Sequence, residues 1–175
     1  ISTEIFPFSF EEYLRYHKVF ETIPDYFDDA DRPRVKHALN NYFRWGGFPE
    51  IQKTEEAERD SVLQDYFNAV VTQDIAERHA VGNKDALRFT ASYLFNAVAE
   101  RSSVAGILSA LEQAGIKSDW DAVKKYIQYY CDAFLFYSVP IHTRSFAQQK
   151  RNPMKYYAVD VGLVRALSLN PGGDR

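Results

Sequence analysis

Apolar residues recur every three or four positions along most of the chain, the spacing that places them on one face of an α-helix. Clusters of glycine, proline and acidic residues interrupt this pattern at residues 24–33, 46–50 and 82–83. Between these breaks the sequence predicts helices over residues 10–21, 34–43, 55–78, 85–99 and 104–114, another that follows Ser118, and a last short one over 161–167.

Several helix ends carry recognisable signals. Ser9 followed by Glu12, and Ser118 followed by Asp121, have the spacing of a capping box, in which the two side chains satisfy each other's backbone N–H groups. The pair Gly46-Gly47 ends the second helix, and Pro49 prevents it from resuming.

The apolar spacing also predicts which helix faces turn inward. In the second helix these positions are Val35, Leu39 and Phe43. In the helix after Ser118 the inward stripe begins with Trp120 and continues through Val123 and Ile127 to either Tyr130 or Cys131.

Near the C-terminus the pattern changes to short strands. Residues 134–139 and 154–159 are rich in aromatic and β-branched side chains and flank a polar segment, 143–152. Three short helices followed by two strands around a polar loop indicate a winged helix-turn-helix unit. The predicted fold is therefore mainly α, a helical bundle followed by a winged-helix-like unit with a small β-hairpin.

A winged helix can contact nucleic acid through its last helix and through the loop between its strands, so polar and basic side chains at these places are the candidate binding residues. On the last helix they lie off the apolar stripe, and on the loop they lie near its tip: Lys124, Lys125, Gln128, Arg144, Lys150 and Arg151. Asp119, Asp121 and Asp132 offset the two lysines. Contact with a protein partner or another domain therefore stays open beside contact with nucleic acid.

Composition and charge add two points. The chain has 175 residues, 46% of them hydrophobic and 15% aromatic, which excludes disorder and favours a soluble globular protein. Residues 1–116 contain 12 basic and 19 acidic residues, a net charge of −7, whereas residues 117–175 contain 9 and 5, a net charge of +4. The basic C-terminal part suits an acidic partner such as DNA, or the asymmetry is chance.

No catalytic or metal-binding constellation is evident. The four histidines lack ligand spacing, Cys131 is a single thiol on the apolar side of its helix, and neither a P-loop nor a dinucleotide fingerprint occurs. We therefore predict no catalytic residue, metal or cofactor for this chain. The lack of an apolar run near 18 residues argues against a membrane partner, and we expect a cytoplasmic protein.

Arg78 has two interpretations. It stands four residues after Asp74 on a predicted helix, so a surface ion pair is the simpler one. The other is an arginine presented to a phosphate bound by a neighbouring subunit.

Several motifs, in order, give the chain a resemblance to a known family. They are residues 4–14, Gly46-Gly47-Phe48-Pro49-Glu50, Asp74-Ile75 with Arg78, Asn96, Pro153-Met154-Lys155-Tyr156-Tyr157 and Asp160-Val161-Gly162-Leu163. Together they resemble the prokaryotic AAA+ superfamily ATPases that carry a C-terminal domain of unknown function.

The resemblance implies a domain arrangement. Residues 1–50 would be the end of the ATPase module and its helical lid, 51–84 a long connecting helix, and 85–175 the winged-helix-like domain. The nucleotide-binding core would precede Ile1, and many family members continue into a nuclease-like domain beyond the last motif. ATP and Mg²⁺ would then belong to the parent chain, and the ATPase module could self-associate.

We therefore expect a non-catalytic fragment of an ATPase that couples nucleotide state to DNA or protein binding. The start at Ile1, without an initiator methionine, agrees with a fragment. The alternative is a stand-alone winged-helix module for protein interaction with no link to ATP, and a third class is an enzyme in its own right.

Overall fold

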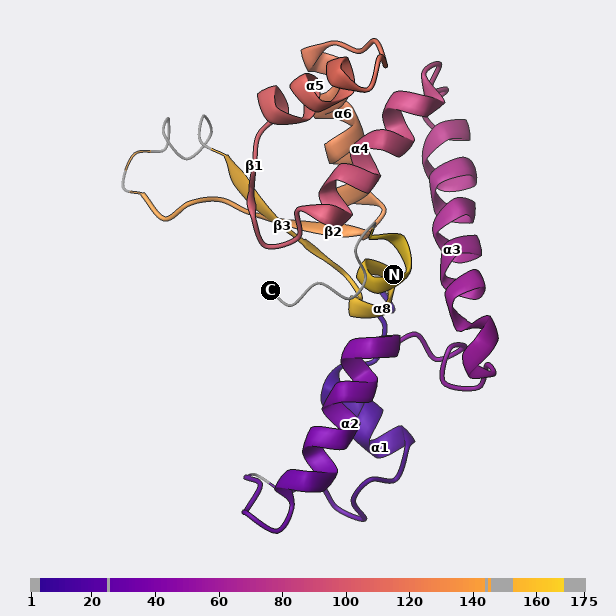
Figure 1. Ribbon diagram of the computed structural model, residues 1–175, viewed down its shortest axis with the longest axis vertical. Helices are drawn as coiled ribbons and strands as arrows, with labels where there is room; N and C mark the ends of the chain where they lie inside the picture. The colour runs from indigo at the N-terminus through magenta and orange to yellow at the C-terminus, as the bar shows by residue number, and fades with distance from the viewer. Residues whose placement is uncertain (1–3, 25, 144, 146–152, 169–175) are drawn as a thin grey trace.

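The computed structural model describes residues 4–24, 26–143, 145 and 153–168. The fold is mainly helical, as predicted, with one small antiparallel sheet of three strands. Figure 1 shows a helical hairpin at one end, a long helical segment along one side, and the sheet with its helices at the other end. In the described part of the chain, no helix combines the length and apolar character needed to cross a membrane.

The N-terminal hairpin consists of α1 (Phe10–Tyr16) and α2 (Arg32–Trp45). The predicted capping box at Ser9 and Glu12 is present, with the Ser9 N–H donating to the Glu12 carboxylate at 2.8 Å. The helix ends at Tyr16 and not at residue 21 as predicted. Lys18 adopts a left-handed backbone conformation, φ 51°, which the hydrophobic spacing alone does not reveal.

The buried face of α2 differs from the predicted one. Ala38 and Trp45 are buried, whereas Phe43, predicted to point inward, is 56% exposed. The reason is that α2 packs on two partners, α1 near its middle and the C-terminal helix near its end. Ala38 belongs to a small hydrophobic cluster with Tyr13 and Leu14, and Trp45 belongs to the main core.

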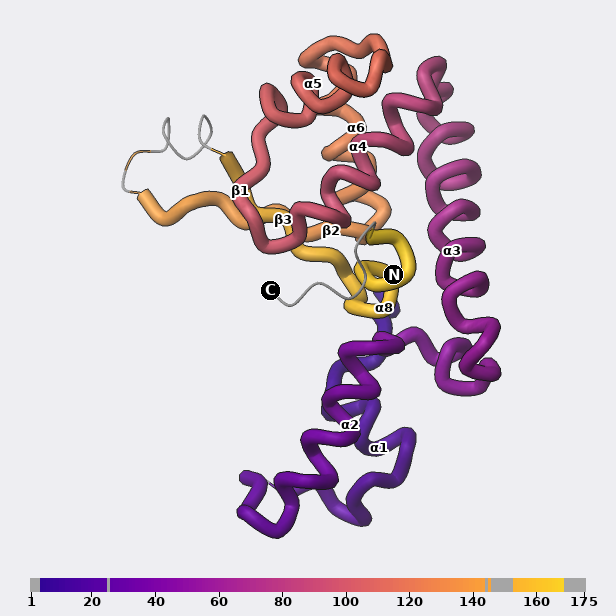
Figure 2. The backbone as a smooth tube through the Cα atoms, in the orientation of Figure 1, coloured from indigo at the N-terminus to yellow at the C-terminus, as the bar shows by residue number. Residues whose placement is uncertain are grey.

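The long helix predicted over residues 55–78 is confirmed as one continuous helical segment of three parts. These are a 3₁₀ turn (Glu56–Glu58), α3 (Arg59–Ala69) and a π-helical stretch, η2 (Val70–Glu77). Figure 2 shows this segment running beside the rest of the domain. Its buried residues include Leu63, Phe67 and Val71, while Tyr66 points outward.

The remaining elements follow in the predicted order, with one addition. They are α4 (Lys84–Asn96), β1 (Arg101–Ser102), α5 (Val104–Gln113), α6 (Trp120–Asp132), β2 (Phe136–Val139), β3 (Met154–Ala158) and α8 (Val161–Leu167). The sheet order is β1-β3-β2, and both pairings are antiparallel. The strand β1 is not predicted, because two residues carry no detectable alternation.

Two predictions about α6 are wrong. Its N-cap is Asp119, whose side chain accepts a hydrogen bond from the Ala122 N–H at 2.8 Å, and not Ser118. Trp120 is 52% exposed rather than part of the inward stripe, since the helix turns Val123, Tyr126, Ile127 and Tyr130 toward the core. Within that core, the Tyr130 hydroxyl donates to the Leu87 carbonyl of α4 at 2.8 Å.

Candidate functional site

A buried carboxylate joins the turn after α2 to the start of the C-terminal helix α8. Asp160 is 3% exposed and caps α8 by accepting hydrogen bonds from the N–H groups of Gly162 at 2.8 Å and Leu163 at 3.2 Å. It also accepts a hydrogen bond from the Gly47 N–H at 2.6 Å. This junction, defined as Gly46, Gly47, Asp160 and Gly162, therefore unites two sequence motifs that lie more than 110 positions apart.

Glycine is required at this junction by close approach. A Cβ added at Gly46, whose φ is 75°, would lie 2.0 Å from the Asp160 Oδ1. At Gly47 it would meet the Phe8 carbonyl oxygen at 2.2 Å, and at Gly162 the Trp45 carbonyl oxygen at 2.4 Å. No real Cβ makes such contacts, so any side chain at these positions would force the two segments apart.

The electrostatics of Asp160 reflect two opposing influences. Burial raises the pKa of Asp160 because it penalises the charged form, and the hydrogen bonds from Gly47, Leu163 and Gly162 partly offset this effect. In the described residues no cation pairs with this carboxylate. Its partners are backbone donors, which suits a structural role and not acid–base chemistry.

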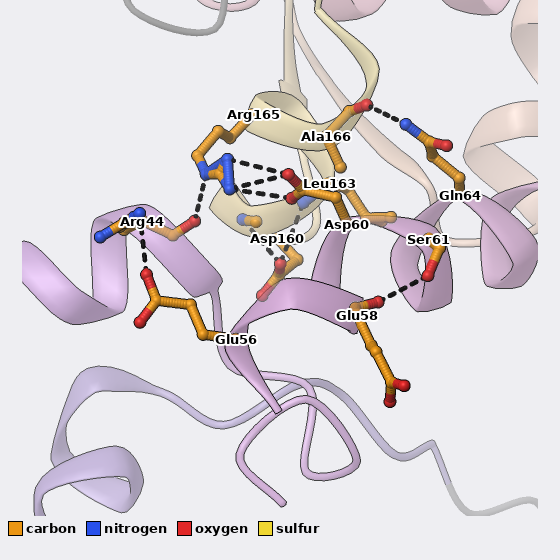
Figure 3. Close-up of polar contacts among 11 residues, drawn as sticks. Arg44, Glu56, Glu58, Asp60, Ser61, Gln64, Asp160, Leu163, Arg165 and Ala166 are labelled. Carbon is orange, nitrogen blue, oxygen red and sulfur yellow. Dashed lines mark hydrogen bonds and ion pairs between the residues drawn. The ribbon is translucent and has the colours of Figure 1, made fainter. Parts of the chain in front are cut away.

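An arginine network lies beside the junction, as Figure 3 shows. Arg165 of α8 donates to both carboxylate oxygens of Asp60, at 2.9 to 3.3 Å, and to the Arg44 carbonyl oxygen at 3.0 Å. The Arg165 guanidinium lies over the Trp45 ring, 4.4 Å from its centroid, and Arg44 and Arg59 lie over the same ring at 4.6 and 5.0 Å. These contacts hold α8 against α2 and α3.

The predicted nucleic-acid residues of α6 are exposed. Lys124, Lys125 and Gln128 lie on the face that points away from α4 and α5. Neither lysine forms an ion pair within the described residues, whereas Gln128 donates to the Asp132 carboxylate at 2.8 Å. Among the described residues, Lys124 and Lys125 are thus available for an outside partner, whereas the Gln128 side chain is already hydrogen-bonded to its neighbour Asp132.

The other candidates stand apart from α6. Arg144, Lys150 and Arg151 lie outside the described residues. Arg78, just beyond η2, forms the expected ion pair with Asp74 at 3.7 Å, and both side chains are mostly exposed. This pair occupies a different element from the two lysines of α6.

The described residues contain no group of three or more histidine, cysteine or acidic side chains placed to hold a metal ion. Burial raises the pKa of the Cys131 thiol, so the nucleophilic thiolate is disfavoured. The sequence analysis assigned no structural role to Asp160. The signal that could have revealed one is an acidic residue at the position just before a short helix, where its side chain can cap the helix.

The comparisons place the chain in a family. A family model described as "Domain of unknown function (DUF8612)" matches residues 36–172. The chain belongs to this family. The matched region of the DUF8612 domain includes both halves of the junction, Gly46-Gly47 and Asp160.

Two curated relatives align with most of the chain. The uncharacterized protein MJ1544 of Methanocaldococcus jannaschii is 24% identical over 161 residues, which cover 91% of this chain and 36% of that protein. An uncharacterized protein of Haemophilus influenzae is 26% identical over 165 residues, 94% of this chain and 39% of the relative. The chain thus spans less than two fifths of their length. No solved structure matches it.

Proposed function

We propose that residues 84–158 form a winged-helix unit that binds duplex DNA, and that the chain belongs to a AAA+ ATPase in which it couples nucleotide state to this binding. The observation that carries the first part is the element order α4-β1-α5-α6-β2-β3 with sheet order β1-β3-β2. This arrangement is typical of winged helices, in which the second helix of the helix-turn-helix enters the major groove.

Local features support α6 as the groove-binding helix. The connection from α5 to α6 contains Gly115 in a left-handed conformation, φ 72°, which allows the tight turn between the two helices. The opposite face of α6 is fixed in the core by Val123 and Tyr130, so the outward lysines are held by a rigid helix. Lys124 and Lys125 are available to neutralise phosphates, since neither is engaged with an acid in the described residues.

The ATPase part of the proposal rests on the sequence motifs that resemble AAA+ proteins. The junction offers a physical route for coupling, because it attaches the N-terminal hairpin to the C-terminal helix α8. ATP and Mg²⁺ would be bound by other parts of the parent chain, and the 175 residues would supply no catalytic group.

Salt-dependent binding to a 20-base-pair duplex tests the DNA proposal. We expect the double variant Lys124→Gln, Lys125→Gln to weaken binding and to lower the slope of log affinity against log salt by about 1.8, because each phosphate contact contributes about 0.9. Lys36→Gln, on the exposed surface of α2, is the matched control and should leave the slope unchanged. Equal slopes for all three proteins would refute the assignment of α6.

A second function, protein interaction through the same unit, is favoured by one observation. Trp120 is exposed at the start of α6 and lies next to Asp119 and Asp121. Exposed tryptophans are common energetic centres of protein interfaces, and neighbouring carboxylates repel DNA. If the chain binds no duplex at low salt, this second function takes precedence, and Trp120→Ala should then abolish co-purification of the partner that is identified.

A further inference from the structure

The outward side of the sheet carries aromatic and basic side chains next to one another. Residues paired across antiparallel strands share one side of a sheet, and so do positions two apart along a strand. Lys155 of β3 is paired with Arg101 of β1 and with Val139 of β2, and Tyr157 is paired with Tyr137. We call this surface the outer sheet face, defined as Arg101, Tyr137, Val139, Lys155 and Tyr157.

The outer sheet face is accessible. Tyr137 and Tyr157 are 42% and 40% exposed, and the other three side chains are exposed as well. The alternate positions of the same strands, Phe136 and Tyr156, are buried in the core. Partial exposure of two neighbouring rings on a sheet is costly, because large apolar surfaces are normally buried.

Charge is distributed unevenly along this face. A groove of about 410 Å³ lies at one end, lined by Arg101, Lys155 and His142 together with apolar side chains, and none of its described lining residues is acidic. At the opposite end Glu4 and Phe6 line a groove with Tyr137, and the Phe6 ring contacts those of Phe134 at 5.6 Å and Tyr137 at 6.4 Å between centroids. An anionic ligand would therefore place its charges toward Arg101 and Lys155.

We propose that the outer sheet face binds single-stranded nucleic acid. The rings of Tyr137 and Tyr157 lie on adjacent strands and offer flat surfaces on which bases stack, while Arg101 and Lys155 contact the phosphates. A duplex hides the faces of its bases, so this surface selects unpaired strands. The inference does not depend on the duplex binding assigned to α6, because it involves other residues on another element.

Fluorescence anisotropy with a labelled 20-nucleotide oligo-dT tests this inference on the whole chain. We expect the variant Tyr137→Val, Tyr157→Val to bind at least about 25-fold more weakly, since two stacked bases at about 1 kcal/mol or more each are lost. Valine keeps the β-propensity of the strands, so the variant should fold, which circular dichroism checks. The matched control Tyr137→Phe, Tyr157→Phe keeps both rings and should bind like the wild type.

The phosphate contacts of Arg101 and Lys155 are tested separately, by the salt dependence of oligo-dT binding. Arg101→Gln with Lys155→Gln should lower the salt slope for oligo-dT by about 1.4, because each phosphate contact on a single strand contributes about 0.7. The inference is overturned if the wild-type chain binds no oligo-dT at low salt, or if the valine variant binds like the wild type. It also fails if the variant Lys124→Gln, Lys125→Gln loses oligo-dT binding together with duplex binding, because α6 would then bind both kinds of DNA. If the wild-type chain binds oligo-dT but no duplex, this inference stands and the proposed duplex binding fails.

Discussion

Asp160 accepts a hydrogen bond from the backbone N–H of Gly47, a residue 113 positions earlier in the chain, at a distance of 2.6 Å. The same carboxylate caps α8 through Gly162 and Leu163. One side chain thus begins α8 and holds the turn that follows α2. This double role makes it the most informative position for mutation.

We predict that Asp160→Asn lowers the free energy of unfolding by about 1–3 kcal/mol, because the amide cannot accept all the buried backbone N–H groups that the carboxylate accepts. Urea denaturation monitored by circular dichroism measures the change. Asp132→Asn, on the exposed end of α6, is the control and should change stability by less than about 0.5 kcal/mol. A variant at Asp160 as stable as this control would contradict the structural role.

The same variant should reveal a pH dependence. The pKa of Asp160 in the folded protein is above its ordinary value near 3.8, so the folded state holds this proton more tightly than the unfolded state. The part of the stability that depends on protonation of Asp160 is therefore greatest below pH 3.8 and is lost as the pH rises through the folded pKa. We expect the stability difference between the wild type and Asp160→Asn to grow as the pH falls from 7 toward 4. Denaturation curves at several pH values measure it, and a difference that shrinks instead would contradict the upward pKa shift.

We predict that Gly162→Ala destabilises the protein by about 1–3 kcal/mol, since the new methyl group would meet the Trp45 carbonyl oxygen at 2.4 Å. Thermal unfolding measures the loss. Gly82→Ala is a suitable control because nothing lies within 4 Å of the added Cβ, so that variant should be neutral or slightly more stable. Equal melting temperatures for the two variants would mean that the junction accommodates the added methyl group, which would contradict the prediction.

The segment between β2 and β3 carries the predicted phosphate contacts Lys150 and Arg151. Replacing both with glutamine should flatten the salt dependence of duplex binding by about 1.8 in the log–log slope, if each neutralises one phosphate. Fluorescence anisotropy over a range of salt concentrations gives the slope. An unchanged slope would exclude these two residues from the interface.

The isolated chain is expected to bind no ATP, because its sequence has no P-loop to cradle the phosphates. Isothermal titration calorimetry with ATP and Mg²⁺ should show only the heat of dilution. Saturable binding would contradict the proposal that ATP is bound outside these 175 residues.

The sequence predicted the elements well where the signal is local. The capping box at Ser9, the helix end at Gly46 and the two main strands all depend on residues within a few positions of one another. Helical periodicity likewise identified the long segment that contains α3 and η2.

Several of the failures share a physical cause, which is dependence on distant partners. Phe43 and Trp120 have the spacing of core residues, but their helices pack on neighbours that favour Ala38 and Tyr126 instead. The strand β1 exists only because Arg101 and Ser102 pair with β3, more than 50 positions later. Likewise, no local pattern around Asp160 reveals that its third donor comes from Gly47.

The exposed face of α6 was predicted correctly for Lys124 and Lys125, because helix geometry alone places them off the buried stripe. The outer sheet face was not predicted, since it requires the register of three strands before Arg101, Lys155 and the two tyrosines can be assigned to one side.

The three glycines around Asp160 also limit how the hairpin can move. With no side chains between the backbones at these positions, the turn after α2 meets the start of α8 directly at the Asp160 carboxylate. Beside it, Arg165 of α8 lies over the Trp45 ring of α2 and binds the Arg44 carbonyl oxygen. The hairpin is therefore attached to α8 at two adjacent places, so a disturbance of the hairpin would reach this one short helix first.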